Sequence, residues 1–197
     1  MSIAAVIIAG GRSSRMGREK ALESVGGIAI LARIISRIQP HVADIVINAN
    51  GPAERFREMG LRIIPDIHSD VGTPLAGLHT ALSIANDEGF SAVLTVPSDC
   101  PFLPDDLVKR LSSLNAPAAI AASGGQAHFV TGLWHPMLLK QMAGALDRPR
   151  PPRLKDWAVE AGAATVEWPV QTFDPFFNVN TPEDLAEANR IAAEFGV

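Results

Sequence analysis

A glycine pair followed by basic residues stands near the N-terminus, in the segment AAVIIAGGRSSRMGREK (residues 4–20). Gly10 and Gly11 carry no Cβ, so a phosphate can approach their backbone N–H groups closely. Arg15 and Lys20 can then neutralise the charge of a triphosphate. The segment matches neither the dinucleotide pattern G-x-G-x-x-G nor the Lys-Ser/Thr ending of a P-loop. It predicts a phosphate-binding loop of another type, with a basic surface loop as the alternative.

A single aspartate, Asp99, follows a run of apolar residues in the segment AVLTVPSDCPF. Mg²⁺ prefers oxygen ligands and the phosphates of a substrate, so a carboxylate at the end of a buried strand is well placed to bind it. The alternative is that Asp99 closes a turn before Pro101 through a hydrogen bond to nearby backbone. The residue alone does not decide between the metal site and the turn.

Other polar side chains also follow apolar runs, namely Asn48, Asn50, Asp66, Asn178 and Asn180. Each has the same ambiguity, because Asn and Asp are common in turns. The five histidines show no metal-ligand spacing such as H-E-x-x-H, and no G-x-S-x-G elbow occurs. The roles of these residues therefore depend on the strands and helices that position them.

Strand-like and helix-like patterns alternate along the chain. The segments predicted as strands are 3–10, 43–50, 61–66, 91–99, 117–123, 127–134, 164–170 and 176–180. The segments predicted as helices are 28–40, 73–89, 103–114, 136–146, 153–162 and 181–195, and residues 147–153 are predicted to form a loop. Two helix starts are marked, one by Thr73 as N-cap and one by the capping-box spacing of Thr181 and Asp184.

Alternation of this kind predicts an α/β fold with three layers, in which helices cover both faces of a mostly parallel, Rossmann-like sheet. Ligands of such folds bind outside the carboxyl ends of the strands. The glycine-rich segment and the polar residues named above lie at or near the carboxyl ends of predicted strands, so they are expected to meet in one crevice.

Bulk properties narrow the class of protein. The 197 residues predict a single domain, 1–197, and no apolar run approaches the roughly 20 residues of a membrane helix. The single cysteine, Cys100, cannot form an internal disulfide, which favours a reducing, cytoplasmic location. The formal net charge of −4 argues against nonspecific binding of nucleic acid.

Six segments occur in a characteristic order between residues 7 and 185: IIAGGRSSRMGREKAL, VINAN, IIPD, GTPLAGL, VPSDCPFLP and FFNVNTPEDL. The first resembles the pattern L-A-G-G-x-S-x-R-M-G-x-x-K of the molybdenum cofactor guanylyltransferases, a family of the nucleotidyltransferase superfamily. The glycine motif is shared across the superfamily, whereas its combination with the later segments is specific. The chain therefore resembles this family over nearly its whole length.

The resemblance implies a role for each matching position. Lys20, Arg15 and Asp99 would be catalytic, and Asp99 would also bind Mg²⁺. Asn178 and Asn180 would border the site where the pterin substrate enters. The nucleotide would be bound by Ile8, Ala9, Gly10, Gly11, Lys20, Asn48, Asp66 and Asp99.

Three positions depart from the family pattern. Ile8 replaces a leucine, which is harmless if only its backbone contacts the ligand. Ala29 stands where a proline is common, which affects a turn. Phe129 follows His128 where the family often has proline, so no pterin contact is assigned to this segment.

The implied reaction is transfer of GMP from GTP to the terminal phosphate of molybdopterin, with release of pyrophosphate. Proteins that mature molybdoenzymes would be further partners. A cytidylyltransferase of the same cofactor is the nearest alternative, but such relatives usually have Ala for Gly10 and Gly for Ser98. Other small-molecule nucleotidyltransferases and a non-catalytic carrier of the cofactor are further alternatives. The presence of both Lys20 and Asp99 argues against the carrier.

Overall fold

The computed structural model describes residues 2–9, 20–68 and 73–197. Within them, seven strands form one sheet in the order β5-β4-β1-β6-β8-β7-β9. All neighbouring strands are parallel except β8, which runs antiparallel to both β6 and β7. The strands of this sheet are β1 (Ile3–Ile8), β4 (Asp44–Asn48), β5 (Arg62–Ile64), β6 (Ala92–Pro97), β7 (Ala118–Ser123), β8 (Gln126–Trp134) and β9 (Ala164–Trp168).

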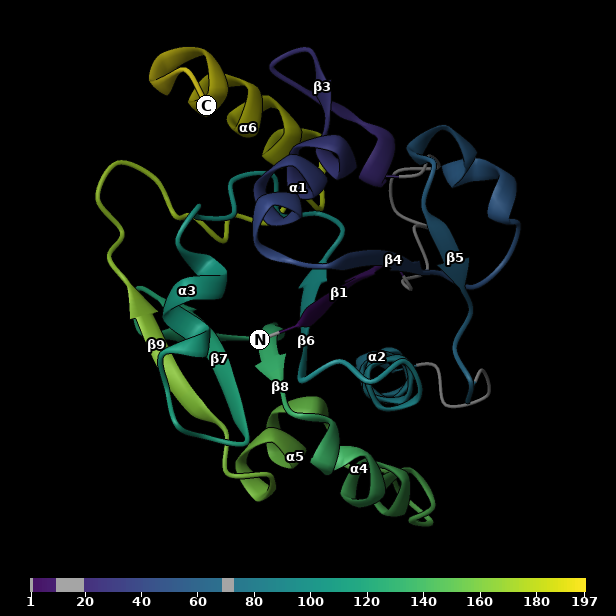
Figure 1. The fold of residues 1–197 in the computed structure, drawn as a ribbon. Helices are drawn as coiled ribbons and strands as arrows, with labels where there is room; N and C mark the ends of the chain where they lie inside the picture. Colours follow the sequence, from purple (N-terminus) through teal and green to yellow (C-terminus); the bar gives the residue numbers. More distant parts are fainter. Residues whose placement is uncertain (1, 10–19, 69–72) are drawn as a thin grey trace.

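Helices cover both faces of the sheet (Figure 1). The side chains of β1 alternate between two buried clusters, so Ile3, Ala5 and Ile7 face one layer while Ala4 and Val6 face the other. The first layer contains α1 (Ile30–Ile38), α3 (Leu107–Ser112) and α6 (Pro182–Phe195), and the second contains α2 (Pro74–Asp87), α4 (Leu139–Leu146) and α5 (Leu154–Glu160). The predicted three-layer, mostly parallel α/β fold is confirmed.

Shorter elements complete the described chain. A two-stranded hairpin, β2 (Ser24–Val25) and β3 (Ile28–Ala29), precedes α1 and was not predicted from the sequence. The 3-10 helices are η1 (Lys20–Leu22), η2 (Gln39–His41), η3 (Ala53–Met59) and η4 (Pro136–Leu138). Residues 147–153, predicted as a loop, contain no helix or strand.

Two local predictions differ from the structure. Residues 176–180 are not a strand, because they cross over the end of the sheet instead of pairing within it. The helix predicted for residues 103–114 is reduced to α3, since Pro104 and the following turn precede it. Thr73 is the N-cap of α2 as predicted, although its side chain makes no capping hydrogen bond. The capping box of Thr181 and Asp184 is present as predicted.

The carboxyl ends of four parallel strands lie level with one another. Ile8 is paired with Asn48 on one side and with Pro97 on the other, and Asn48 is paired with Ile64. The segments that follow β1, β4, β5 and β6 therefore leave the sheet along one edge. This register brings residues that are distant in sequence to the same end of the molecule.

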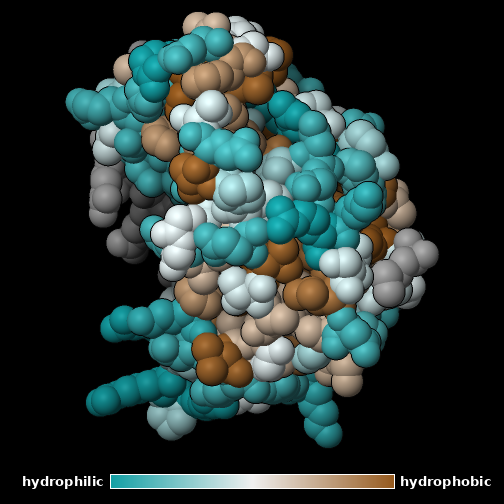
Figure 2. All heavy atoms as spheres, turned by 90° about the vertical axis from the view of Figure 1, so that its left-hand side faces the viewer, coloured by the Kyte–Doolittle hydropathy of each residue, from teal (hydrophilic) through white to brown (hydrophobic). Residues whose placement is uncertain are grey.

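One face of the molecule shows how apolar residues are distributed over the described surface. Figure 2 shows the face that carries β9 and α3, where hydrophobic residues are separated by hydrophilic ones. The large exposed hydrophobic residues of the described chain come from different segments, for example Ile28 in β3, Met137 in η4 and Val159 in α5. Apolar residues scattered in this way are ordinary on a protein surface. In the described chain no helix is long and apolar enough to cross a membrane.

Candidate active site

A chain of hydrogen bonds joins the first and last parts of the sequence at the carboxyl edge of the sheet. The Lys20 Nζ donates to Asn180 Oδ1 at 3.0 Å, and Asn180 Nδ2 donates to Asn178 Oδ1 at 2.6 Å. The Asn178 side chain in turn hydrogen-bonds the Asp99 carboxylate. Four residues that the sequence predicted as site residues are thus brought into one cluster, although 160 positions separate Lys20 from Asn180.

The segment 178–180 is held over the sheet at both of its ends. The Val179 backbone N–H donates to the Asp99 carbonyl at 2.9 Å, and the Val179 side chain is fully buried. Asp184, in the first turn of α6, accepts hydrogen bonds of 2.9 Å from the backbone N–H groups of Asn180 and Thr181. The bond from Asn180 is the main reason that the pKa of Asp184 is lowered. The capping box therefore also fixes the two asparagines beside Asp99.

Asp99 carries a charge whose burial is only partly compensated. Its carboxyl is half-buried, and burial raises its pKa from the ordinary 3.8 to about 6. The Lys20 cation and the hydrogen bond from Asn178 oppose this rise without cancelling it. A further cation next to Asp99 would supply the missing compensation, so the group fits a metal ligand better than a simple turn residue.

A second polar cluster lies at the ends of β4 and β5. Asn48 Nδ2 donates to Asp66 Oδ1 at 2.9 Å and to the Ile64 carbonyl at 3.1 Å. Asn50 Nδ2 donates to Asp66 Oδ2 at 2.8 Å, and its Oδ1 accepts from the Asp66 backbone N–H at 2.9 Å. Asp66 is half-buried, and two amides hold its carboxylate in a fixed orientation. The sequence predicted Asn48 and Asp66 as site residues but left the role of Asn50 open.

A glycine in α2 makes room for the Asn48 side chain. A Cβ added at Gly77 would lie 2.7 Å from Asn48 Oδ1 and 3.3 Å from Ile8 Cγ2. Asn48 is 1% exposed, and its Oδ1 has no hydrogen-bond partner among the described residues. Because its Nδ2 is bonded to Ile64 and Asp66, the amide cannot turn away without releasing Asp66.

We therefore expect Gly77→Ala to destabilise the protein by about 1–3 kcal/mol, because the added methyl group overpacks a buried polar cluster. Gly144→Ala is the matched control, since Gly144 is also in a helix but has open space around it. That substitution should stabilise the protein by about 0.5–1 kcal/mol through helix propensity. Urea unfolding measures both effects, and equal stability of the two variants would contradict the assigned packing.

The backbone of Ile8 and Ala9 is less available than predicted. The Ala9 N–H donates to the Asn48 carbonyl at 2.8 Å, and the Ile8 carbonyl accepts from the Ser98 N–H at 3.2 Å. The Ala9 N–H and the Ile8 carbonyl are therefore both used inside the fold, and the backbone contacts of these two residues with a nucleotide stay a prediction. Gly10, Gly11 and Arg15 lie outside the described residues, so their roles stay predictions.

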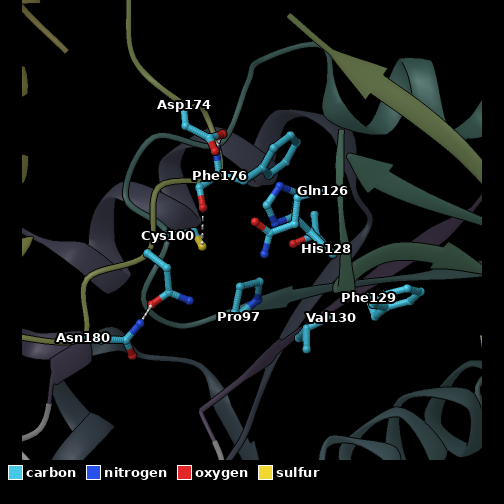
Figure 3. Close-up of a pocket in the computed structure, with 11 residues that line it drawn as sticks. Pro97, Cys100, Gln126, His128, Phe129, Val130, Asp174, Phe176 and Asn180 are labelled. Atoms are coloured by element: carbon cyan, nitrogen blue, oxygen red, sulfur yellow. Dashed lines mark hydrogen bonds between the residues drawn. The ribbon is translucent and has the colours of Figure 1, made fainter. Parts of the chain in front are cut away.

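A pocket of about 400 Å³ opens next to Asn178 and Asn180 (Figure 3). It forms where the regular pairing of β8 with β6 and β7 is interrupted. The last residue of β6 paired with β8 is Thr95, opposite Gly132, so β6 continues to Pro97 without that partner. The register between β7 and β8 also shifts, because Ile120 is opposite Gly132 whereas the next residue is opposite His128. The residues of this bulge, 129–131, all line the pocket.

Three linked polar residues at this pocket were not predicted from the sequence. Ser123 Oγ lies 2.7 Å from His128 Nε2 and donates to Asp174 Oδ1, also at 2.7 Å. Asp174 Oδ1 accepts a second hydrogen bond, of 2.8 Å, from the Phe176 N–H. The only local signal was the position of Asp174 just before the segment FFNVN. Neither the bulge nor the pairing of β7 with β8 can be read from short segments.

No cluster of three or more His, Cys, Asp and Glu side chains able to hold a metal ion occurs in residues 2–9, 20–68 and 73–197. The donors at Asp99 are one carboxylate and the neighbouring Asn178 amide. Such a small set suits a cation that keeps water and substrate phosphates among its ligands, as Mg²⁺ does. Cys100, the neighbour of Asp99, is buried, and burial raises the pKa of its thiol well above the ordinary value.

Relatives with assigned functions match this chain over nearly its whole length. The chain is 43% identical over 195 residues to a protein of Nitrobacter hamburgensis called molybdenum cofactor guanylyltransferase, covering 95% of this chain and 93% of the relative. It is 39% identical over 199 residues to the protein of the same name from Bradyrhizobium sp., covering 98% and 94%.

Solved structures support the fold. The molybdopterin-guanine dinucleotide biosynthesis protein A of Archaeoglobus fulgidus superposes with a TM-score of 0.73 at 21% identity, covering 98% of this chain and 99% of the other. The 4-diphosphocytidyl-2C-methyl-D-erythritol synthase of Anaerococcus prevotii gives a TM-score of 0.74 at 16% identity, covering 98% and 96%. The MobA-like NTP transferase domain matches residues 5–160. The predicted family resemblance is confirmed, and the chain belongs to the MobA-like nucleotidyltransferases.

Proposed function

We propose that this protein transfers GMP from GTP to the terminal phosphate of molybdopterin, which yields the guanine dinucleotide form of the cofactor and pyrophosphate. The main support is the position of the Lys20–Asn180–Asn178–Asp99 chain between two binding features at one edge of the sheet. On one side lies the Asn48–Asp66 cluster, and on the other lies the pocket beside Asn178 and Asn180. The names of the curated relatives agree with this assignment.

The reaction needs no nucleophile from the protein. An oxygen of the acceptor phosphate forms a bond to the α-phosphorus of GTP, and the bond between that phosphorus and the α,β-bridging oxygen breaks with loss of pyrophosphate. The protein therefore acts by positioning the reactants and by stabilising the charge that develops on the leaving group. Among the described residues of the site, the Lys20 ammonium supplies positive charge, and Asn180 orients it.

We infer that Asp99, together with the Asn178 amide, would hold Mg²⁺. The bound cation would neutralise phosphate charge and polarise the phosphoryl oxygens. Asn178 would also keep the carboxylate oriented through its hydrogen bond. The assignment rests on the uncompensated burial of Asp99 and on the chemistry of the donor set.

The Asn48–Asp66 cluster would recognise the base. The Asp66 carboxylate is held by two amide donors, and its remaining lone pairs can accept the N1–H and N2–H₂ donors of guanine. Asn48 Oδ1 is buried against α2, so it supports Asp66 and is not itself exposed to a ligand. Cytosine presents an acceptor at N3 and adenine an acceptor at N1, which would face the carboxylate without a proton between them.

We therefore expect GTP to be preferred over CTP and ATP by about 10- to 100-fold in kcat/KM, because a buried polar group left unpaired costs about 1–3 kcal/mol. The measurement is pyrophosphate release with each triphosphate at subsaturating concentration, with Mg²⁺ and molybdopterin present. Asp66→Asn should reduce the preference, because the amide replaces one acceptor oxygen by a donor. Equal rates with GTP and CTP would contradict a guanylyl-specific enzyme but leave nucleotidyl transfer in place, whereas faster release with CTP would favour the cytidylyl alternative.

Release of pyrophosphate would also exclude a non-catalytic carrier of the cofactor, which would bind the pterin without turnover. The cytoplasmic location and the transfer of product to proteins that mature molybdoenzymes are further proposals. The proposed location rests on the single cysteine, and the proposed transfer rests on the family to which the chain belongs.

A further inference from the structure

The pocket beside Asn178 contains a histidine, His128, whose ring is held in place by a hydrogen bond to a buried serine. Ser123 Oγ is 2.7 Å from His128 Nε2 and 2.7 Å from Asp174 Oδ1, so the serine bridges the other two side chains. Ser123 is 2% exposed, and the His128 ring packs on Phe176 with ring centroids 4.7 Å apart. Figure 3 shows His128 with Phe176 and Asp174 at the pocket.

The hydrogen-bond donors and acceptors determine which ring nitrogen of His128 carries the proton. A serine hydroxyl has one proton, and an ionised carboxylate can only accept. Ser123 therefore donates to Asp174 and must accept from His128, which places the histidine proton on Nε2. Burial lowers the pKa of His128, against the opposing charges of Asp174 and Glu167, so the ring is neutral at neutral pH.

The other ring nitrogen, Nδ1, is then an unprotonated acceptor. It makes no hydrogen bond to any residue in the described part of the chain, and the ring lines the pocket. The surroundings offer both flat apolar contact and polar contact. Phe129 and Val130 of the bulge contribute the apolar surface, and the Gln126 amide contributes a donor and an acceptor.

We propose that His128 Nδ1 binds an N–H donor on the edge of a planar nitrogen heterocycle carried by the acceptor substrate, and that Ser123 and Asp174 are positioning residues that set its tautomer. The identity of the heterocycle as a pterin rests on the proposed function. A pterin carries an exocyclic amine and ring N–H groups along one edge. The 400 Å³ pocket is in the size range of small-molecule sites, and it opens beside Asn178, which hydrogen-bonds Asp99, and beside Asn180.

The test compares the acceptor KM with the GTP KM in variants of the relay. His128→Phe should raise the KM for molybdopterin by about 10- to 100-fold and leave the KM for GTP unchanged, because only the acceptor loses a buried hydrogen bond. His128→Asn should recover part of the loss, since its amide oxygen can occupy the place of Nδ1. His41→Phe is the matched control, because His41 is exposed at the end of η2 and should behave as the wild type.

A spectroscopic measurement tests the relay without any turnover. In ¹⁵N–¹H correlation spectra at neutral pH, His128 of the wild type should show protonated Nε2 and unprotonated Nδ1. Ser123→Ala should convert the ring to a mixture of tautomers and raise the acceptor KM, and Ser123→Thr, which keeps the hydroxyl, should restore both values. Loss of packing alone would not move the proton between the two nitrogens.

The outcomes separate this proposal from the proposed function. If the wild type releases no pyrophosphate from GTP and molybdopterin, the proposed function fails, while the tautomer can still be measured. If the wild type is active but His128→Phe and Ser123→Ala keep the wild-type acceptor KM, the relay has no part in binding and this inference fails. A wild-type His128 protonated on Nδ1 would also overturn it.

Discussion

Asp99→Asn should lower the rate of guanylyl transfer by about 100-fold or more while leaving the fold intact. The substitution keeps the size of the side chain. The new amide can also replace the hydrogen bond that the carboxylate makes with Asn178. It removes the negative charge that would hold Mg²⁺ beside the substrate phosphates. Pyrophosphate release at saturating GTP and molybdopterin measures the effect.

The same substitution should make the metal-free protein more stable at neutral pH. The pKa of Asp99 is about 6 in the folded state and near 3.8 when the chain is unfolded. As the pH rises, the Asp99 carboxyl therefore loses its proton at a lower pH in the unfolded chain than in the folded protein. The free energy of unfolding consequently falls between pH 3.8 and about 6. The penalty at neutral pH is at most about 3 kcal/mol, and it is less to the extent that solvent reaches the carboxylate.

Urea unfolding in the presence of EDTA at about pH 7.5 and about pH 4 measures this penalty. The variant should be more stable than the wild type at the higher pH, and the difference should shrink at the lower pH. Asp87→Asn serves as the control, because Asp87 is exposed near the end of α2. Near-normal activity of Asp99→Asn would show that Asp99 only closes a turn.

Elements with strong local patterns were predictable from the sequence. The apolar runs of β1 and β6 are buried on both faces, which is why they show no alternation and why they predict a covered parallel sheet. The capping box of α6 uses side chains three positions apart, so its residues suffice to predict it. Asn48 and Asp66 could be predicted as neighbours because the carboxyl ends of parallel strands share one edge.

Features that depend on distant pairing were not predictable. The apolar residues of segment 176–180 look like a strand, but this segment crosses the end of the sheet, where Val179 is hydrogen-bonded to the loop after β6 and the side chains of Phe176 and Val179 are buried. The Ser123–His128–Asp174 relay needs the bulge of β8, the β7–β8 pairing and the position of Asp174 together. None of these three features can be predicted from a stretch of a few residues.

Lys20→Ala is expected to reduce kcat by about 100-fold and to weaken GTP binding much less. Negative charge builds up on the pyrophosphate as it leaves, so a cation contributes more in the transition state than in the bound ground state. Lys20 is suited to this role because Asn180 Oδ1 fixes its ammonium at 3.0 Å, in the cluster that contains Asp99. Turnover and GTP affinity must therefore be measured separately, the latter by calorimetry without the acceptor.

Two comparisons make the Lys20 result specific. Lys140→Ala removes an exposed lysine of α4 and should leave kcat and GTP affinity unchanged. Arg18→Ala, at a position outside the described residues, should also change little, because the family pattern places the phosphate contact at Lys20. A larger loss of kcat in Arg18→Ala than in Lys20→Ala would mean that the alignment of the glycine-rich segment is wrong. Equal losses of kcat and of GTP affinity in Lys20→Ala would instead limit Lys20 to binding the ground state.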